Sequence, residues 1–170
     1  MLPLQDVVPT HRVPISTLVL IGLNVAVFGA QLAGAANSVM AAPFTHAGAG
    51  LLVIAVVALW LFGDHVEARL GRAVFTVVYL MGGWLTGMAG TGAVTAVLGS
   101  YFVLLPRSRV LTLVPLPPLL VEVPAAFFLG VWTVLHMVQF VNDPRTLWAY
   151  ALAFLWGALV ARWRRRPIRW

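Results

Sequence analysis

The stretch Thr91-Gly-Ala-Val-Thr-Ala-Val-Leu-Gly-Ser100 consists almost entirely of small residues. Small side chains let helix backbones approach each other closely inside a membrane. As a helix, the apolar run Thr91–Leu105 would rise about 22 Å, less than the roughly 30 Å of a hydrocarbon core. A helix end at that depth is tolerated only inside protein or beside a water-filled cavity. We therefore expect a short central helix with Thr91 at the floor of a cavity.

Apolar runs flank this stretch on both sides. The chain has 170 residues, of which 61% are hydrophobic and only 9% charged, whereas a soluble domain carries about a quarter charged residues. A fold of this size could not hide so much apolar surface from water, so lipid must be part of its solvent. We predict one all-α membrane domain over residues 1–170 with six transmembrane helices. The predicted helices are Pro14–Ala33, His46–Phe62, Ala73–Ala89, Thr91–Leu105, Pro124–Phe140 and Leu147–Ala161.

The basic residues predict the orientation of these helices. All eleven are arginines, and with the N-terminus inside only Arg145 falls on the outer side. Such an excess marks the cytoplasmic face, so both termini are predicted in the cytoplasm. Arginines placed singly or in pairs between apolar runs argue against nucleic-acid binding, despite the net charge of +6. The tail Trp163–Trp170 is interpreted as an interfacial anchor on anionic lipid.

The linkers and the glycines complete the predicted architecture. Pro106–Val123 contains four prolines, so we expect it to be non-helical and to lie along the cytoplasmic face. Gly63–Arg72 is expected to be a solvated, salt-bridged turn, with charges at Asp64, Glu67, Arg69 and Arg72. Small residues expected to allow close helix packing are Gly83, Gly87, Gly90, Ala153, Gly157 and Ala161. Cysteine is absent, which excludes a disulfide framework and a thiolate site.

Several short motifs occur in a characteristic order along the chain. They are Pro3-Leu-Gln-Asp6, Ile21-Gly-Leu-Asn24, Phe44-Thr-His46, Leu59-Trp-Leu-Phe-Gly-Asp-His-Val-Glu67, Pro106-Arg-Ser-Arg-Val-Leu-Thr-Leu-Val-Pro115, Leu129-Gly-Val-Trp132 and Trp148-Ala149. In this order, they resemble the six-helix core of the rhomboid intramembrane serine proteases. The resemblance runs collinearly from end to end and implies a rhomboid-like bundle.

The resemblance also implies where a catalytic site would lie. The family's nucleophilic serine, in a Gly-x-Ser-Gly motif, corresponds here to Thr91 within Ala89-Gly-Thr-Gly92. The family's catalytic histidine corresponds to Tyr150, directly after Ala149. Of the two histidines and one asparagine on the family's second helix, His46 is retained, while the other two positions hold Leu51 and Ala55. The loops before the second and fourth helices are reduced to stubs.

These replacements remove the chemistry that acyl transfer needs. That reaction requires a nucleophile, a base with a pKa near neutrality and oxyanion donors. A tyrosine has a reference pKa of about 10 and is already protonated at pH 7, so it cannot take the place of histidine as base. We expect Tyr150 and Thr91 to hydrogen-bond to each other instead. His46 or His136 could approach Thr91 as a substitute base, but lone histidines more often have a structural role. We therefore interpret His46 as the cap of a helix end at the interface and His136 as a hydrogen-bond partner of a neighbouring helix.

Two functions from different classes remain in view. The first is a non-catalytic rhomboid-like protein that binds a partner's transmembrane helices, as a scaffold, chaperone or accessory subunit of a membrane complex. The alternative is an intramembrane endopeptidase with Thr91 as nucleophile. A carrier ranks last because no inverted repeat is visible, and a metal site of His46, His136 and Asp143 lacks ligand spacing. No cofactor is expected, and arginine without lysine suggests a GC-rich bacterial genome and its inner membrane.

Overall fold

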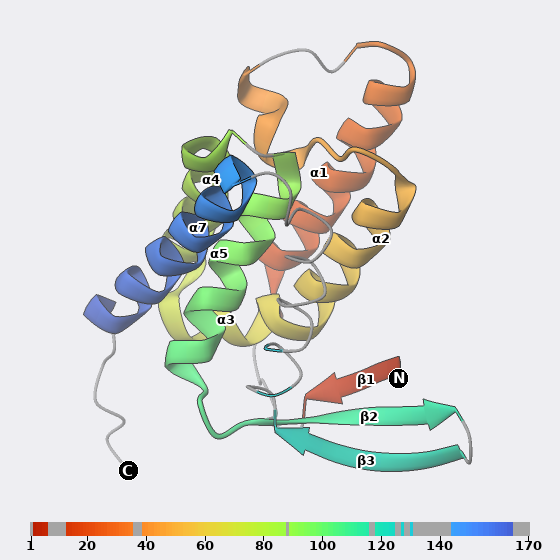
Figure 1. The fold of residues 1–170 in the computed structure, drawn as a ribbon, viewed down its shortest axis with the longest axis vertical. Helices are drawn as coiled ribbons and strands as arrows, with labels where there is room; N and C mark the ends of the chain where they lie inside the picture. The colour runs from red at the N-terminus through yellow and green to blue at the C-terminus, as the bar shows by residue number, and fades with distance from the viewer. Residues whose placement is uncertain are drawn as a thin grey trace.

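The computed structural model describes residues 2–6, 13–35, 39–87, 89–115, 118–124, 127, 130 and 144–164. These residues form a helical bundle with a small sheet at one end (Figure 1). In chain order the elements are β1 (Leu2–Asp6), α1 (Ile15–Leu32), the 3-10 helix η1 (Val39–Phe44), α2 (Ala49–Ala58), the π-helical turn η2 (Leu59–Gly63), α3 (Asp64–Leu70), α4 (Arg72–Thr86), α5 (Ala89–Leu104), β2 (Arg109–Pro115), β3 (Pro118–Pro124) and α7 (Pro144–Arg164).

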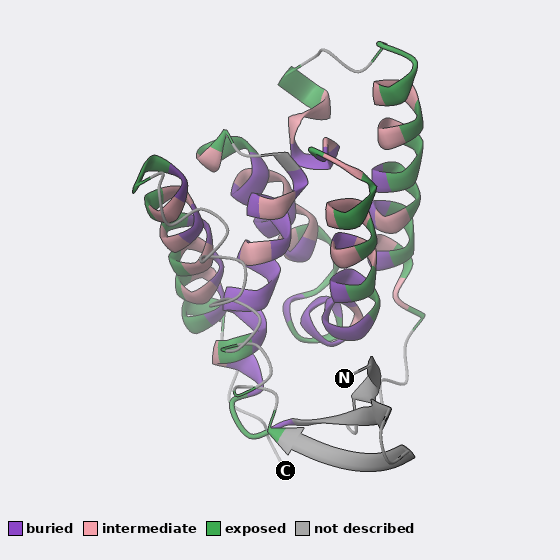
Figure 2. Cartoon of the chain, turned by 45° about the vertical axis from the view of Figure 1, so that its right-hand side comes forward, coloured by how far each residue is buried: buried purple, intermediate pink, exposed green. Residues whose placement is uncertain are grey.

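Helix α5 lies at the centre of the bundle. It contacts α4, α7, α2 and α3, and Ala93, Ala96 and Tyr101 on it are completely buried. Figure 2 shows buried residues concentrated along α5, whereas α1 and α7 carry exposed faces on the outside. With 16 residues, α5 confirms the predicted short central helix. Its small side chains allow neighbours on several sides to approach the backbone closely.

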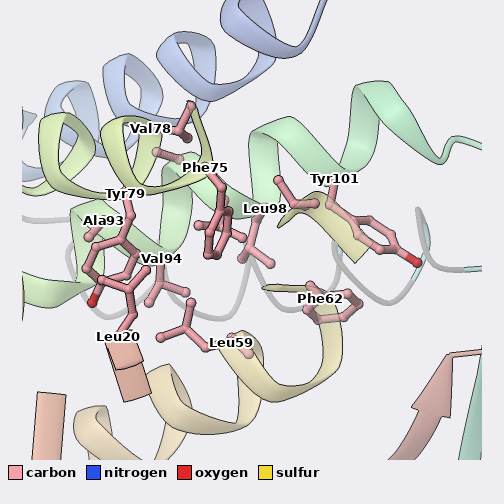
Figure 3. Packing of buried hydrophobic residues seen from close by; sticks show 14 of the residues in the cluster. Leu20, Leu59, Phe62, Phe75, Val78, Tyr79, Ala93, Val94, Leu98 and Tyr101 are labelled. Carbon is pink, nitrogen blue, oxygen red and sulfur yellow. The ribbon is translucent and has the colours of Figure 1, made fainter. Parts of the chain in front are cut away.

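Aromatic side chains fill the space between α5, α4 and η2 (Figure 3). Phe62, Phe75, Tyr79 and Tyr101 are all fully buried. The rings of Phe62 and Tyr101 meet edge to face with 4.8 Å between centroids, an arrangement that adds about 0.5–1.5 kcal/mol beyond area burial. This cluster holds the centre of the bundle together around α5.

The second helix is longer than predicted and begins later. α2, η2 and α3 run on as one helical segment, Ala49–Leu70, of 22 residues, where the sequence predicted His46–Phe62. The helix continues because no proline interrupts it, and it ends at Gly71, whose φ of 82° favours glycine. At Gly63, inside the π-helical turn, a Cβ would lie 2.9 Å from Cγ2 of Thr17. The glycine therefore allows α1 to approach closely.

The other helix bounds differ from prediction at their ends. α4 ends at Thr86 because Gly87 adopts a left-handed conformation, with φ of 57°. Gly87 is therefore a helix cap, and its predicted role in close packing is wrong. α7 has 21 residues and is longer than the predicted Leu147–Ala161, with Pro144 in the first position, where proline is well tolerated. The predicted fifth helix, Pro124–Phe140, lies almost entirely outside the described residues.

Three helical segments of the described chain are long and apolar enough to cross a membrane. They are Ile15–Leu32, Ala49–Leu70 and Pro144–Arg164. The shorter apolar helix Gly90–Leu104 lies between them in the bundle. The chain is therefore an integral membrane protein.

Close approach at small residues occurs where the sequence indicated it, apart from Gly87. A Cβ at Gly83 would lie 2.6 Å from Cα of Pro43. A Cβ at Gly157 would overlap the carbonyl group of Ala96 on α5. Ala153 and Ala161, on the same helix as Gly157, are almost completely buried, with 1% and 0% of their surface exposed. The packing role predicted for these positions is confirmed.

A three-stranded antiparallel sheet is the element that the predicted all-α class did not include. β1 pairs with β2, and β2 pairs with β3, in the order β1-β2-β3. The two later strands fall within Pro106–Val123, which was predicted to be non-helical because of its prolines, except that β3 also includes Pro124, the predicted start of the fifth helix. Pro115 and Pro118 pair with each other at the adjoining ends of these strands, where a missing N–H costs little. The correction adds a sheet at the end of a bundle that is otherwise helical, as predicted.

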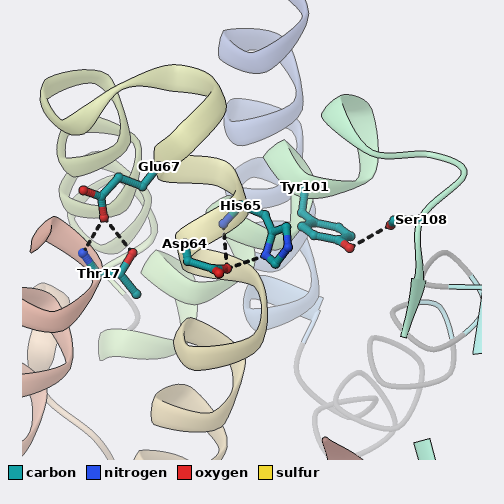
Figure 4. A network of polar contacts seen from close by, with 6 residues as sticks. All are labelled: Thr17, Asp64, His65, Glu67, Tyr101 and Ser108. Atoms are coloured by element: carbon teal, nitrogen blue, oxygen red, sulfur yellow. Dashed lines mark hydrogen bonds and ion pairs between the residues drawn. The ribbon is translucent and has the colours of Figure 1, made fainter. Parts of the chain in front are cut away.

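The predicted solvated turn also needs correction. Asp64 and Glu67 belong to α3, and Glu67 is only 5% exposed. Its carboxylate accepts hydrogen bonds from the backbone N–H of Thr17, at 2.8 Å, and from the Thr17 hydroxyl, at 2.9 Å (Figure 4). The predicted ion pair is present, with 3.6 Å between Glu67 Oε1 and Arg72 Nε. Glu67 is buried because it caps the first turn of α1, whose N–H groups lack helical partners.

Candidate functional site

The candidate site lies where α5 begins, beneath a short strap formed by residues 43–46. The backbone N–H of Gly90, at the start of α5, donates to the carbonyl oxygen of Thr45 at 2.7 Å. From α1, the Gln31 side chain bonds both backbone groups of His46. Its Nε2 donates to the carbonyl oxygen at 2.7 Å and its Oε1 accepts from the N–H at 3.1 Å. The strap is thus tied to α1 and α5 at once.

A third helix, α4, holds the strap from the other side. The Tyr79 hydroxyl accepts a hydrogen bond from Nδ2 of Asn24 at 2.7 Å and donates its single proton to the carbonyl oxygen of Pro43 at 3.3 Å. Asn24 is fully buried on α1 and donates from Nδ2 to the carbonyl oxygen of Leu20 at 2.6 Å. These buried hydrogen bonds join α1, α4 and the strap, so the strap has little freedom to move away from α5.

The strap places the His46 ring against the backbone of α5. The side chain is 1% exposed, and a Cβ at Gly90 would lie 2.5 Å from its Nε2. Its Nδ1 lies 2.9 Å from the carbonyl oxygen of Phe44, so Nδ1 carries the proton and Nε2 offers a lone pair in the neutral ring. Within the described part of the chain, Nε2 has no hydrogen-bond partner. His46 is therefore a buried residue of the site, and not a helix cap at the interface.

Thr91 and Tyr150 meet across the contact between α5 and α7. Tyr150 is only 4% exposed, and its hydroxyl lies beside the Thr91 side chain. Thr91 is half-buried, and its carbonyl oxygen accepts a hydrogen bond from the Thr95 hydroxyl at 2.7 Å. The two positions that correspond to nucleophile and base are thus brought together, but each presents a hydroxyl to the other.

The remaining candidate residues contribute no donor or fall outside the described chain. Leu51 and Ala55 lie on α2, and Ala55 is 2% exposed. Their side chains are hydrocarbon, so they cannot stabilise an oxyanion. His136 and Asp143, considered as a substitute base and as metal ligands, lie outside the described residues. Among the residues that the structure describes, no group of three His, Asp or Glu side chains could hold a metal ion.

Gln31 was not among the predicted site residues, although its side chain holds both the N–H and the carbonyl group of His46. Its only sequence signal is an amide side chain near the end of the first apolar run. A long polar side chain at that position needs partners when it is half-buried. The site's geometry thus depends on a residue 15 positions away from the histidine that it holds.

The fold and the site together define an integral membrane protein with a polar cluster at the start of a short central helix. A family model described as the Rhomboid domain matches residues 33–166, so the chain belongs to the rhomboid family. The match covers α2 to α7 and includes Thr91, Tyr150, His46, Leu51 and Ala55. No curated protein and no solved structure matches the chain.

Proposed function

We propose that this chain is a catalytically inactive rhomboid that binds a transmembrane helix of a partner protein. The observation that carries the proposal is the contact between Thr91 and Tyr150 at the positions of nucleophile and base. A threonine hydroxyl needs a base to become a nucleophile, and a tyrosine, with a reference pKa of about 10, holds its proton at pH 7. Leu51 and Ala55 add no oxyanion donor. The chain thus retains the helical bundle of the family but lacks the base and the oxyanion donors that the reaction needs.

The packing above Thr91 supports the same proposal. The His46 ring covers Gly90, and the strap is fixed by Gln31, Tyr79 and the start of α5. Opening the site to a substrate backbone would break several buried hydrogen bonds, each worth about 1 kcal/mol. Such a rigid cover is better suited to a stably bound partner in a membrane complex than to a substrate that must enter the site and be released.

We further propose that the chain spans a bacterial inner membrane with six helices and that both of its termini lie in the cytoplasm. Arg69 and Arg162 lie in the last turns of α3 and α7, and Arg107 lies between the end of α5 and β2. Figure 1 shows that the chain passes from the lower end of α5 into the sheet. Arg145 lies at the start of α7, near the opposite end. This distribution agrees with the positive-inside rule when the sheet faces the cytoplasm. The partner, whether it is bound by this chain as a scaffold or belongs with it to a larger complex, would then contact the chain within the bilayer.

Co-purification in a mild detergent tests the partner proposal. The tagged chain would be isolated from its native membrane beside an unrelated multi-pass protein expressed at the same level. We expect one membrane protein to accompany the chain in a fixed ratio and to be absent from the control. A monodisperse chain that carries no protein beyond those in the control would contradict the proposal.

A protease that uses Thr91 is the second candidate, and the geometry of His46 favours it. The ring is neutral with Nδ1 as donor, so Nε2 is an available base beside Gly90, the residue before Thr91. If His46 activates Thr91, a fluorophosphonate probe should label Thr91 covalently. Labelling should then be lost in both Thr91→Val and His46→Ala. Equal labelling of wild type and Thr91→Val would remove this candidate.

A further inference from the structure

An apolar groove runs between α1 and α4 on the outside of the bundle, which we call the α1/α4 groove. It has a volume of about 410 Å³, and its walls include Val19 and Leu23 from α1 and Leu80 and Trp84 from α4. Val19 and Leu23 are 53% and 41% exposed. In a membrane these side chains face hydrocarbon, so the groove suits an apolar occupant.

The length of the groove distinguishes between two apolar occupants. Its lining extends from Ile15 to Leu23 on α1 and from Thr76 to Trp84 on α4, a rise of about 12 Å on each helix. Half of a roughly 30 Å hydrocarbon core is about 15 Å, the depth of one leaflet. A transmembrane helix needs about 20 residues and would extend far beyond the groove. The groove therefore matches an acyl chain of one leaflet.

The groove ends at a polar cleft near the sheet. Ser16 lines the groove, and its backbone N–H donates to Glu67 Oε1 at 3.1 Å. Glu67 in turn lies 3.6 Å from Arg72 Nε. Glu67 and Arg72 line a second hollow of about 480 Å³, together with Asp64, Val13 and Gly71. The apolar groove and the charged cleft thus adjoin at the first turn of α1.

The cleft carries charge of both signs. The Arg72 side chain is 62% exposed, and a guanidinium has five N–H donors, so it can face Glu67 through Nε and still bind a phosphate. Glu67 is occupied by the first turn of α1, as Figure 4 shows for Thr17. Asp64 contacts His65 and also lines the cleft, with 21% of its side chain exposed. A cation beside the phosphate would therefore meet a carboxylate.

We propose that the α1/α4 groove and this cleft form a binding site for one zwitterionic phospholipid with a primary ammonium headgroup, such as phosphatidylethanolamine. One acyl chain fills the groove, the phosphate pairs with Arg72, and the ammonium donates to Asp64. A purely anionic headgroup could pair its phosphate with Arg72 but would bring no cation to Asp64. A quaternary ammonium lacks N–H donors for a carboxylate. The site therefore selects the headgroup as well as the leaflet, and it is independent of the partner proposed above.

Native mass spectrometry of the purified chain tests this site. The protein would be exchanged into detergent with equal amounts of phosphatidylethanolamine, phosphatidylcholine and phosphatidylglycerol. We expect one retained phosphatidylethanolamine per chain, preferred at least roughly tenfold over the other two, which one charge-assisted hydrogen bond can supply. Equal retention of the three lipids, or preference for phosphatidylglycerol, would overturn the proposal.

Matched variants separate this site from general lipid adhesion. Leu23→Trp fills the groove, and Val25→Trp places the same bulk on an exposed part of α1 outside the lining, where the native side chain is 52% exposed. Arg72→Gln removes the phosphate partner, and Arg69→Gln is its control at the same end of α3. We expect retention to fall roughly tenfold in Leu23→Trp and Arg72→Gln only. Should Leu23→Trp fold poorly, Val19→Trp fills the same groove. If lipid retention falls equally in each variant and its control, the proposed binding site is wrong.

Crosslinking identifies what occupies the groove in the membrane. Because the chain has no cysteine, Leu23→Cys can carry a photoreactive maleimide at that position alone. We expect adducts with lipid in native membranes. A stoichiometric adduct with a protein would show that a partner helix occupies the groove, and would overturn the lipid proposal.

Discussion

Glu67 shows most clearly that the neighbours of a residue in the sequence do not reveal its burial or its long-range contacts. Its neighbours Asp64, Arg69 and Arg72 indicate a charged, solvated turn with salt bridges, and Glu67 does form an ion pair with Arg72. The carboxylate is nevertheless buried, because Ser16 and Thr17 present N–H groups that have no helical partner. Those residues lie about fifty positions earlier in the chain, and nothing in the local charge pattern indicates that contact.

Replacing Glu67 tests the cap at the start of α1. Glu67→Ala would leave two backbone N–H groups and the Thr17 hydroxyl without their acceptor, so we expect a loss of about 2 kcal/mol in stability. Thermal denaturation followed by circular dichroism in detergent measures the change. Arg69→Ala, at an exposed position on the same helix, should alter the midpoint little. Equal effects of the two substitutions would show that the cap contributes nothing.

The site residues were predicted with different success. The family resemblance placed Thr91 and Tyr150 at corresponding positions, and the structure brings their side chains together. His46 was interpreted as a helix cap at the interface, yet it is buried against Gly90. The reason is the strap, whose position depends on Gln31, Tyr79 and Gly83 from two other helices. Such long-range bonds leave no periodic signal in the sequence.

At the scale of elements, hydrophobic runs predicted which segments are helical better than where they end. α1 begins and ends within one residue of the predicted Pro14–Ala33. The ends of α3 and α4 are set by Gly71 and Gly87, whose positive φ values require glycine. Both glycines are visible in the sequence, but each also fits a packing role. The sheet was missed because β2 pairs with β3 and also with β1, a long-range pairing that prolines alone do not indicate.

The crossing of α5 and α7 depends on Gly157. A side chain there would overlap the carbonyl group of Ala96, and the Ser100 hydroxyl donates to the Gly157 carbonyl oxygen at 2.9 Å. We expect Gly157→Leu to separate the two helices and to cost about 3 kcal/mol or more through overpacking. Resistance to proteolysis in detergent reports the loosened bundle. Ala158→Leu, one residue further along, is the control, and a bundle that tolerates both equally would contradict this packing.

At the scale of the whole molecule, the distribution of arginines predicts an orientation that can be measured. The absence of cysteine allows single-cysteine variants without background. Arg107→Cys and Arg145→Cys place a thiol at exposed positions toward opposite ends of the bundle. In intact cells, a membrane-impermeant maleimide should label Arg145→Cys and leave Arg107→Cys unlabelled until the membrane is permeabilised. The reverse pattern would invert the proposed topology.

The family was already apparent from the order of short motifs along the chain, and the match to the Rhomboid domain over residues 33–166 confirms it. A rhomboid bundle positions a nucleophile and a base between its central and last helices, and here both positions carry hydroxyl side chains. Our proposal of binding without catalysis rests on this altered site within a retained bundle.

We propose that this rhomboid cleaves no substrate, and a reporter assay tests this proposal most directly. The wild-type chain and Thr91→Val would each be expressed with a panel of transmembrane reporters in a host that lacks other rhomboids, and cleavage would be measured by immunoblot. We predict no cleavage by wild type above the level seen with Thr91→Val. Cleavage that appears with wild type and disappears with Thr91→Val would contradict the account and identify the chain as a protease with a threonine nucleophile.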